Sequence, residues 1–250
     1  MRGLVKAFRL EMGHILESKV RFLSNFLIPI AITIVLGEAG NSACSWCPGQ
    51  HTYFNYYTSL IFSTSMIFIA TQLMVLRIVG ERAPYGTLDR DLLAISRFGM
   101  YFGKFLAGVT IVIIQCFLFL AVGKVLYSML LKGSVYLFFG LLFMVSVVGL
   151  LTGLFFSVIT KTKEQAVQLV PFAILIFLVL SGDLIPIADM PSFLGQIASN
   201  LPITLANEGL RKVMLEGKNF QDISSQIAKL LAWIVGMLFF GLVKFATEKK

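Results

Sequence analysis

Charged residues are scarce in this sequence. Asp, Glu, Lys and Arg together make up 14% of its 250 residues, whereas 57% are hydrophobic and the mean hydropathy is +0.85. A soluble domain of this length would need far more polar surface. The scarcity of charge therefore excludes an ordinary soluble protein, and we expect an all-α membrane protein.

Long apolar runs, by contrast, are abundant. A helix needs about 20 mostly apolar residues to cross the hydrocarbon core of a bilayer. Six stretches qualify by length and absence of charge, although the first is short: 22–37, 56–79, 103–125, 134–159, 166–185 and 227–245. No separate soluble domain fits in the remainder, so we expect residues 1–250 to form a single transmembrane domain. The charges spread through the first 21 residues also argue against a cleavable signal peptide.

Histidine and cysteine are rare, which limits the catalytic and metal-binding chemistry. The histidines are His14 and His51, on opposite predicted sides of the membrane, and there is no His-Glu-x-x-His motif. Cys44, Cys47 and His51 share the first outer loop, but a structural zinc site usually needs four ligands. We therefore expect no metal site and no catalytic residue. Whether Cys44 and Cys47 form a disulfide or remain thiols stays open.

The sequence also lacks an ATP-binding motif. A phosphate-binding loop needs Gly-x-x-x-x-Gly-Lys followed by Ser or Thr. The Gly-Lys pairs at 103–104, 123–124 and 217–218 are followed by Phe105, Val125 and Asn219. The interiors of the predicted spans lack charged residues, which argues against a proton- or ion-coupled carrier. This chain is therefore not expected to be an enzyme or to bind a cofactor, and ATP and Mg²⁺ would be bound by a separate subunit.

Basic residues are distributed unevenly between the two sides of the predicted membrane domain. Most of the 21 Lys and Arg residues fall in segments that share a side with the two termini. By the positive-inside rule, both termini are expected in the cytoplasm, in a multi-pass protein of the cell (plasma) membrane. The net charge of +8 is explained by this topology and by the anionic inner leaflet, so no nucleic acid partner is expected.

The N-terminal segment, residues 4–20, has the periodicity of an amphipathic helix. One face carries Leu4, Val5, Phe8, Met12, Ile15 and Leu16, and the opposite face carries Lys6, His14, Glu17 and Arg21. A basic amphipathic segment just before a span is typical of an interfacial helix on the inner leaflet, which we expect within residues 1–21. A solvated cap that only anchors the chain is the alternative.

Charge is concentrated in the stretch GERAPYGTLDRDLLAIS, residues 80–96, between the second and third spans. Pro84 and Gly86 end the preceding helix, and Thr87 is a suitable N-cap for a new one. The new helix is amphipathic, and its charged residues remain for a partner. We expect a docking surface, with a loop that merely enforces topology as the alternative. The candidate docking residues are Glu81, Arg82, Gly86, Thr87, Leu88, Asp89, Arg90 and Leu92.

Polar residues within the spans are few. Thr58, Ser65 and Gln72 of the second span follow one another at seven-residue spacing and therefore share a helix face. In a bilayer such residues join helices, bond to their own helix backbone, or line a polar path.

The outer segment after the fifth span is too apolar for an ordinary solvated loop. It contains two short helical patterns and the prolines Pro186, Pro191 and Pro202. We expect short helices that dip partway into the membrane under the shelter of neighbouring spans.

Two of these segments carry a resemblance to a known family. ERAPYGTLDRDLL…GKFLAG resembles the pattern Glu-Arg-x-x-Gly-Thr-Leu-(Glu/Asp)-x-Leu-Leu…Gly-Lys of ABC-2 type export permeases, the membrane subunits of ATP-binding-cassette exporters. SGDLIPIADMPSFLGQIASNLPITLANEGLRKVM resembles the outer segment of the same family. The resemblance covers nearly the whole chain and implies the G-type (type V) fold: six spans, an interfacial helix, a coupling helix at 81–97 and outer re-entrant helices. Members often carry a proline between the Leu-Leu and the Gly-Lys, which is absent here, so the end of the coupling helix is not defined.

The resemblance also implies roles for individual residues. Glu81 and the helix 86–96 would dock on an ABC ATPase (nucleotide-binding) subunit. A second copy of the chain or a sister permease would complete a central path, lined by the second and fifth spans, with Thr58, Ser65, Gln72 and Gln168 as candidates. The segment 186–213 would form the outer gate, with Pro186, Pro191 and Pro202. We therefore expect the permease of an ATP-driven exporter, and the alternative is a non-transporting membrane scaffold that recruits a cytoplasmic partner.

Overall fold

The structure is a computed structural model. It describes residues 2–17, 53–82, 97–182 and 185–247, together with residues 23, 26, 27, 30, 31, 33–35 and 38. The regular elements of this part of the chain are all helical, which confirms the predicted class. They are α1 (Arg2–Glu17), α3 (Tyr53–Arg82), α5 (Arg97–Tyr127), α6 (Val135–Ile159), α7 (Lys163–Leu180), η1 (Ile187–Asp189), α8 (Ser192–Ala198), α9 (Pro202–Glu216), η2 (Phe220–Ile223) and α10 (Ser224–Thr247).

Five helices of the described residues are long and apolar enough to cross a bilayer. These segments are Asn55–Arg82, Gly99–Tyr127, Val135–Ile159, Lys163–Leu180 and Phe220–Gly241. They match the second to sixth predicted spans, and five apolar helices of this length are typical of a multi-pass membrane protein. Half of the first predicted span, 22–37, lies outside the described residues, and the residues described within it are helical. The complete six-span layout therefore stays a prediction.

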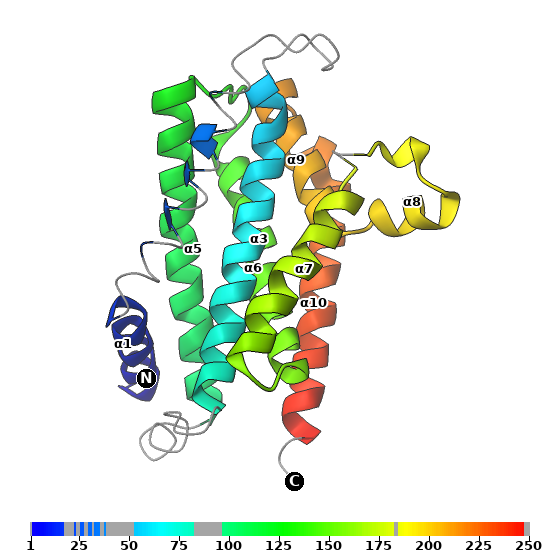
Figure 1. The fold of residues 1–250 in the computed structure, drawn as a ribbon. Coiled ribbons are helices and arrows are strands. Elements are labelled where there is room, and N and C mark those ends of the chain that lie inside the picture. The colour runs from blue at the N-terminus through cyan, green and yellow to red at the C-terminus, as the bar shows by residue number, and fades with distance from the viewer. Residues whose placement is uncertain are drawn as a thin grey trace.

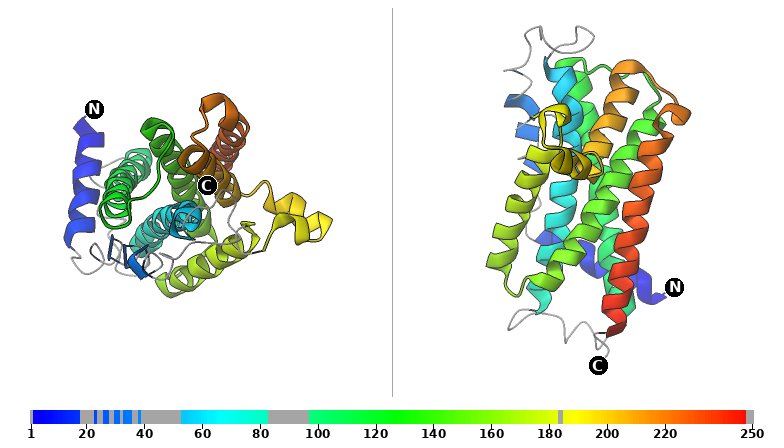
Figure 2. Two further views of the ribbon diagram at one scale, coloured as in Figure 1. Left: turned by 90° about the horizontal axis from the view of Figure 1, so that it is seen from above. Right: turned by 90° about the vertical axis from the view of Figure 1, so that its right-hand side faces the viewer.

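The span helices run alongside one another, and α1 lies crosswise to them at one end of the bundle (Figures 1 and 2). The end of α10 lies at the same end as α1, whereas α8 and α9 lie at the opposite end (Figure 1). The placement of α1 in the plane of the membrane surface and the placement of both termini in the cytoplasm stay predictions.

The centre of the bundle is the contact between α3 and α6, which two glycines of α6 make possible. A Cβ atom on Gly149 would lie 2.8 Å from the Ile67 carbonyl oxygen, and one on Gly153 would lie 2.5 Å from the Thr71 carbonyl oxygen. The Thr71 hydroxyl also donates a hydrogen bond of 3.0 Å to the Gly149 carbonyl oxygen. Small residues four apart let two membrane helices approach to backbone contact, and polar groups then bond between them.

The outer segment forms two helices of different character. Pro202 is the first residue of α9, where its fixed φ favours helix initiation. One side of α9 packs against α3, α6 and α10, and most of its residues are buried. In contrast, α8 projects from the bundle and leaves Phe193 70% exposed (Figure 1). The expected shelter by neighbouring spans is therefore found for α9 and not for α8, and the depth of both helices in the membrane stays a prediction.

Candidate functional site

A cluster of four charged side chains lies where α3 ends and α5 begins. Lys104 of α5 is at its centre: its Nζ is 2.5 Å from Glu11 Oε1 of α1 and 2.7 Å from Glu81 Oε2 of α3. Arg77 of α3 completes the cluster, with Nη2 at 2.6 Å from Glu11 Oε2 and at 3.2 Å from Glu81 Oε1. Three helices from separate parts of the sequence are thus joined by ion pairs. We call these residues, Glu11, Arg77, Glu81 and Lys104, the ion cluster.

Three of the four residues of the ion cluster are buried, and the Arg77 side chain is 18% exposed. The exposed fraction is 3% for Glu11, 5% for Glu81 and 2% for Lys104. Two carboxylates face two cations, so the formal charges of the four residues cancel. Buried charges are tolerated only when they are paired. Removing one partner of a buried pair typically costs about 3–5 kcal/mol, because the other charge is left uncompensated.

Close packing between α1 and α5 brings Glu11 to the cluster. A Cβ atom on Gly103 would lie 2.8 Å from the Ala7 Cβ and 3.1 Å from the Ala7 carbonyl carbon, so a larger residue at 103 would push the helices apart. Ala7 and Glu11 are one helical turn apart and both are buried. The N-terminal helix α1 is therefore attached to the bundle through Ala7, which packs against Gly103, and through the Glu11 carboxylate. These contacts are additional to the apolar face that the sequence predicts for this helix.

The predicted docking residues fall partly within the described part of the chain. The Glu81 carboxylate turns into the ion cluster. Arg82, the last residue of α3, donates hydrogen bonds to the Ser157 carbonyl oxygen at 3.2 Å and to the Tyr101 hydroxyl at 3.0 Å. The other predicted docking residues lie outside the described residues: Gly86, Thr87, Leu88, Asp89, Arg90 and Leu92. The coupling helix and its docking role stay predictions.

The residues predicted to line a substrate path differ in their exposure within this single chain. Thr58 is fully buried in α3, and Ser65 and Gln72 of the same helix are half-buried. Gln168 is exposed on α7. α7 packs against α3, so the two helices implied by the family resemblance are neighbours. Their role in a path is not tested by the fold of a single chain.

Polar contacts tie α9 to the outer half of α3. Ser63 donates a hydrogen bond to Oδ1 of Asn207, and both residues are buried. One turn further along α9, Arg211 Nη1 donates to the Tyr56 hydroxyl at 2.9 Å, and its guanidinium carbon lies 4.5 Å from the centre of the Tyr56 ring. Of the predicted gate residues, Pro186 precedes η1, Pro191 precedes α8 and Pro202 begins α9, so each initiates a helix.

Sequence reasoning missed most of these contacts. It treated Arg77 and Lys104 as topological charges and did not single out Glu11, Asn207 or Arg211. The spacing of Arg77 and Glu81, four residues apart at the end of an apolar run, was an available indication of paired charges. Nothing in the sequence placed Glu11 beside them. In the described residues no group of three or more His, Cys, Asp or Glu could hold a metal ion, and Cys44, Cys47 and His51 lie outside that part.

Comparison with known proteins gives the family. The chain matches the family described as ABC-2 type transporter over residues 9–215. It is 24% identical over 168 residues to ABC transporter G family member 20 of Dictyostelium discoideum, a match that covers 66% of this chain and 23% of that relative. It is 27% identical over 165 residues to ABC transporter G family member 23 of the same organism, covering 65% and 23%. The match thus spans less than a quarter of the length of these curated relatives. With five apolar helices of spanning length and a family match over most of its residues, this chain belongs to the ABC-2 type transporter family.

Proposed function

We propose that this chain is the membrane-spanning permease subunit of an ABC exporter. It moves a substrate out of the cytoplasm with energy from ATP that a separate nucleotide-binding subunit binds with Mg²⁺ and hydrolyses. Both termini lie in the cytoplasm, and the complex resides in the cell membrane. The observation that carries the proposal is the ion cluster, because it joins α1 to the two spans that flank the predicted docking helix 86–96.

The ion cluster makes the ends of α3 and α5 move as one unit. The nucleotide-binding subunit contacts the docking helix and pulls or pushes on it as ATP binds. Because Lys104 bonds to Glu81 across the docking segment, that displacement reaches both spans and, through Glu11, the N-terminal helix. Only a difference in contact between the ATP-bound and ATP-free states of the partner can drive such a shift.

Helix α3 connects this inner end to the outer segment. Its 30 residues extend over about 45 Å at 1.5 Å per residue. The inner end carries Arg77 and Glu81 of the ion cluster, and the outer half carries the Ser63–Asn207 and Tyr56–Arg211 contacts. A displacement of α3 therefore acts on α9, and the segment 186–213 opens and closes as the outer gate.

A second permease copy, identical or a sister chain, completes the transport path. The span α7 leaves large apolar side chains on its outer face, with Phe172 63% and Leu175 56% exposed. In this arrangement α3 and α7 of each copy line the path, and Thr58, Ser65, Gln72 and Gln168 supply its polar groups.

The test is reconstitution with a nucleotide-binding subunit, and an ATPase encoded in a neighbouring reading frame would be the first candidate. We expect the two proteins to copurify and the rate of ATP hydrolysis in vesicles to depend on this chain. The double replacement Glu81→Gln and Lys104→Met keeps the cluster neutral. Because the Glu81 carboxylate is buried in the cluster and not at the surface, this variant is expected to preserve copurification while lowering transport-linked ATP hydrolysis. If the nucleotide-binding subunit hydrolyses ATP at the same rate with and without this chain, the proposal is contradicted. That result would favour the non-transporting membrane scaffold.

A further inference from the structure

A long apolar groove runs along α10 on the outside of the bundle. Its volume is about 770 Å³, within the range of about 300–1,000 Å³ typical of sites for drug-sized ligands. Its walls come from α5, α6 and α10, with a contribution from the inner end of α3. Phe102 of α5 and Leu238 and Phe240 of α10 line it and are 43–47% exposed within spanning segments, so the groove opens toward the bilayer.

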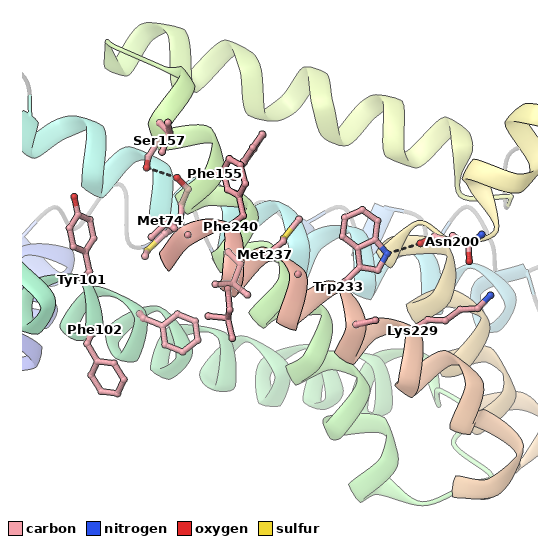
Figure 3. Close-up of a pocket in the computed structure, with 18 of the residues that line it drawn as sticks. Met74, Tyr101, Phe102, Phe155, Ser157, Asn200, Lys229, Trp233, Met237 and Phe240 are labelled. Atoms are coloured by element: carbon pink, nitrogen blue, oxygen red, sulfur yellow. Dashed lines mark hydrogen bonds between the residues drawn. The ribbon is translucent and has the colours of Figure 1, made fainter. Parts of the chain in front are cut away.

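The two ends of the groove are polar, unlike its middle. Lys229 lies at one end with Trp233, whose indole nitrogen donates a 2.8 Å hydrogen bond to the Asn200 carbonyl oxygen (Figure 3). Arg82 and Tyr101 lie at the other end. From Lys229 to Gly241 the groove follows α10 for about 18 Å at 1.5 Å per residue. This length exceeds half the thickness of the hydrocarbon core of a bilayer, which is about 30 Å thick in total.

The groove has cations and aromatic residues at its ends and an apolar middle, which match the charged headgroup and the acyl chains of a phospholipid. Trp and Tyr favour the headgroup level of a membrane, and a lysine at that level attracts anionic lipid. We propose that this groove binds an anionic phospholipid, with its phosphate at Lys229 and one acyl chain along α10 between α5 and α6. The site is separate from the ion cluster and does not depend on the proposed ATP-driven export.

A second copy of the chain fits the groove poorly. The two-fold axis of a membrane homodimer stands normal to the bilayer, so a residue meets its own counterpart at the same depth. Pairing through this groove would bring Lys229 close to Lys229 and Arg82 close to Arg82, and like charges opposed in this way cost energy. An anionic occupant has the opposite effect, because it neutralises the cation at the end of the groove.

Gly236 of α10 offers a way to fill the groove without disturbing the fold. It lines the groove, and a Cβ atom built on it meets no atom within 4 Å. Gly236→Phe therefore extends a ring into open space. Gly140 of α6 is the matched control, because it is also a helical glycine with no atom within 4 Å of its Cβ position, and it does not line the groove.

The experiment uses the fluorescence of Trp233. The full-length chain with Trp46→Phe, in which Trp233 is the remaining tryptophan, is placed in phosphatidylcholine vesicles. Phosphatidylglycerol or phosphatidylcholine with brominated acyl chains, which quench tryptophan on contact, is then titrated in. We expect brominated phosphatidylglycerol to reach half-quenching at a mole fraction about fivefold lower, the factor equivalent to about 1 kcal/mol per cation near anionic lipid. Lys229→Gln and Gly236→Phe should remove this preference, and Gly140→Phe should retain it.

Three results would overturn the proposal. The first is equal quenching by the two brominated lipids in the parent protein. The second is an unchanged lipid preference in the Gly236→Phe variant. The third is efficient disulfide formation between two chains that carry Gly236→Cys, which would show that a second copy occupies the groove.

Discussion

The Lys104 ammonium lies 2.7 Å from the Glu81 carboxylate, so the last turn of α3 is bonded to the second turn of α5. The same ammonium also lies 2.5 Å from the Glu11 carboxylate, which adds the N-terminal helix to the assembly. Loss of Lys104 would therefore affect three helices at once.

Replacing Lys104 with methionine should destabilise the protein by about 3–5 kcal/mol, because two buried carboxylates lose a shared cation. Adding Glu81→Gln should recover part of this loss, since Glu11 then remains paired with Arg77. The free energy of unfolding, followed by the helical signal in detergent, gives the measurement. Lys212→Met is the control: its partner Glu208 is half exposed, so the change should stay below about 1 kcal/mol. Equal effects of Lys104→Met and Lys212→Met would contradict the prediction.

Replacing Gly153 with alanine should separate α6 from α3. The new Cβ atom would lie 2.5 Å from the Thr71 carbonyl oxygen, and a helix backbone cannot yield without moving the whole contact. We expect a loss of stability of about 1–3 kcal/mol, the usual result of overpacking a core. Gly140→Ala has open space and should be neutral or slightly stabilising because alanine favours helix. Thermal unfolding of the two variants side by side distinguishes the outcomes.

Replacing Asn207 with leucine should loosen α9 from α3, because the buried Ser63 hydroxyl loses its acceptor on α9. The expected cost is about 0.5–1.5 kcal/mol, the net contribution of one hydrogen bond, because the Ser63 hydroxyl keeps the Ser59 and Leu60 carbonyl oxygens of its own helix as acceptors. Amide hydrogen exchange should become faster in α9 and remain unchanged at the ion cluster. Asn200→Leu, at an exposed position, serves as the control. Unchanged exchange in α9 would mean that this bond does not hold the outer segment.

Replacing Gln115 with leucine should leave stability unchanged or raise it. The Gln115 side chain is fully buried in α5, and neither atom of its amide has a hydrogen-bond partner in the structure. Leucine removes the unsatisfied groups while keeping a similar volume, so the gain could reach about 1–3 kcal/mol. Unfolding in detergent tests this directly. A marked loss of stability would contradict the prediction.

Leu88→Asp and Gly86→Pro should each abolish copurification of the nucleotide-binding subunit and leave membrane insertion intact. The first places a charge on the apolar stripe predicted for the docking helix, and the second restricts the backbone before it. Affinity purification of the coexpressed pair measures the loss. Lys161→Asp, in the short turn between α6 and α7, should keep the partner bound. Normal copurification of the nucleotide-binding subunit with both docking variants would contradict the predicted docking surface.

Helix positions were largely predictable from the sequence. The apolar runs at 134–159 and 227–245 became α6 and α10 with ends that differ by at most three residues. The membrane explains this success, because lipid requires each spanning segment to satisfy its own backbone hydrogen bonds and to be apolar along its length. The prolines of the outer segment were informative for a similar local reason, since each precedes or begins a helix.

The partners of the polar residues were not predictable in this way. Glu11 and Lys104 are 93 positions apart, and Ser63 and Asn207 are 144 apart. Each residue has an ordinary explanation within its own segment, as a surface charge or a hydroxyl bonded to its own helix. The contact exists only because Gly103 lets α1 approach α5, and because α9 packs against α3.

The amino-acid sequence by itself therefore determined that the chain is a helical membrane protein and which segments form its long helices, since apolarity and helix-breaking residues act locally. Only the tertiary structure decided that the charges at the ends of the spans form a single buried cluster and that an apolar groove follows α10. Both features depend on how closely neighbouring helices approach, and that distance is set by packing of side chains far apart in the sequence.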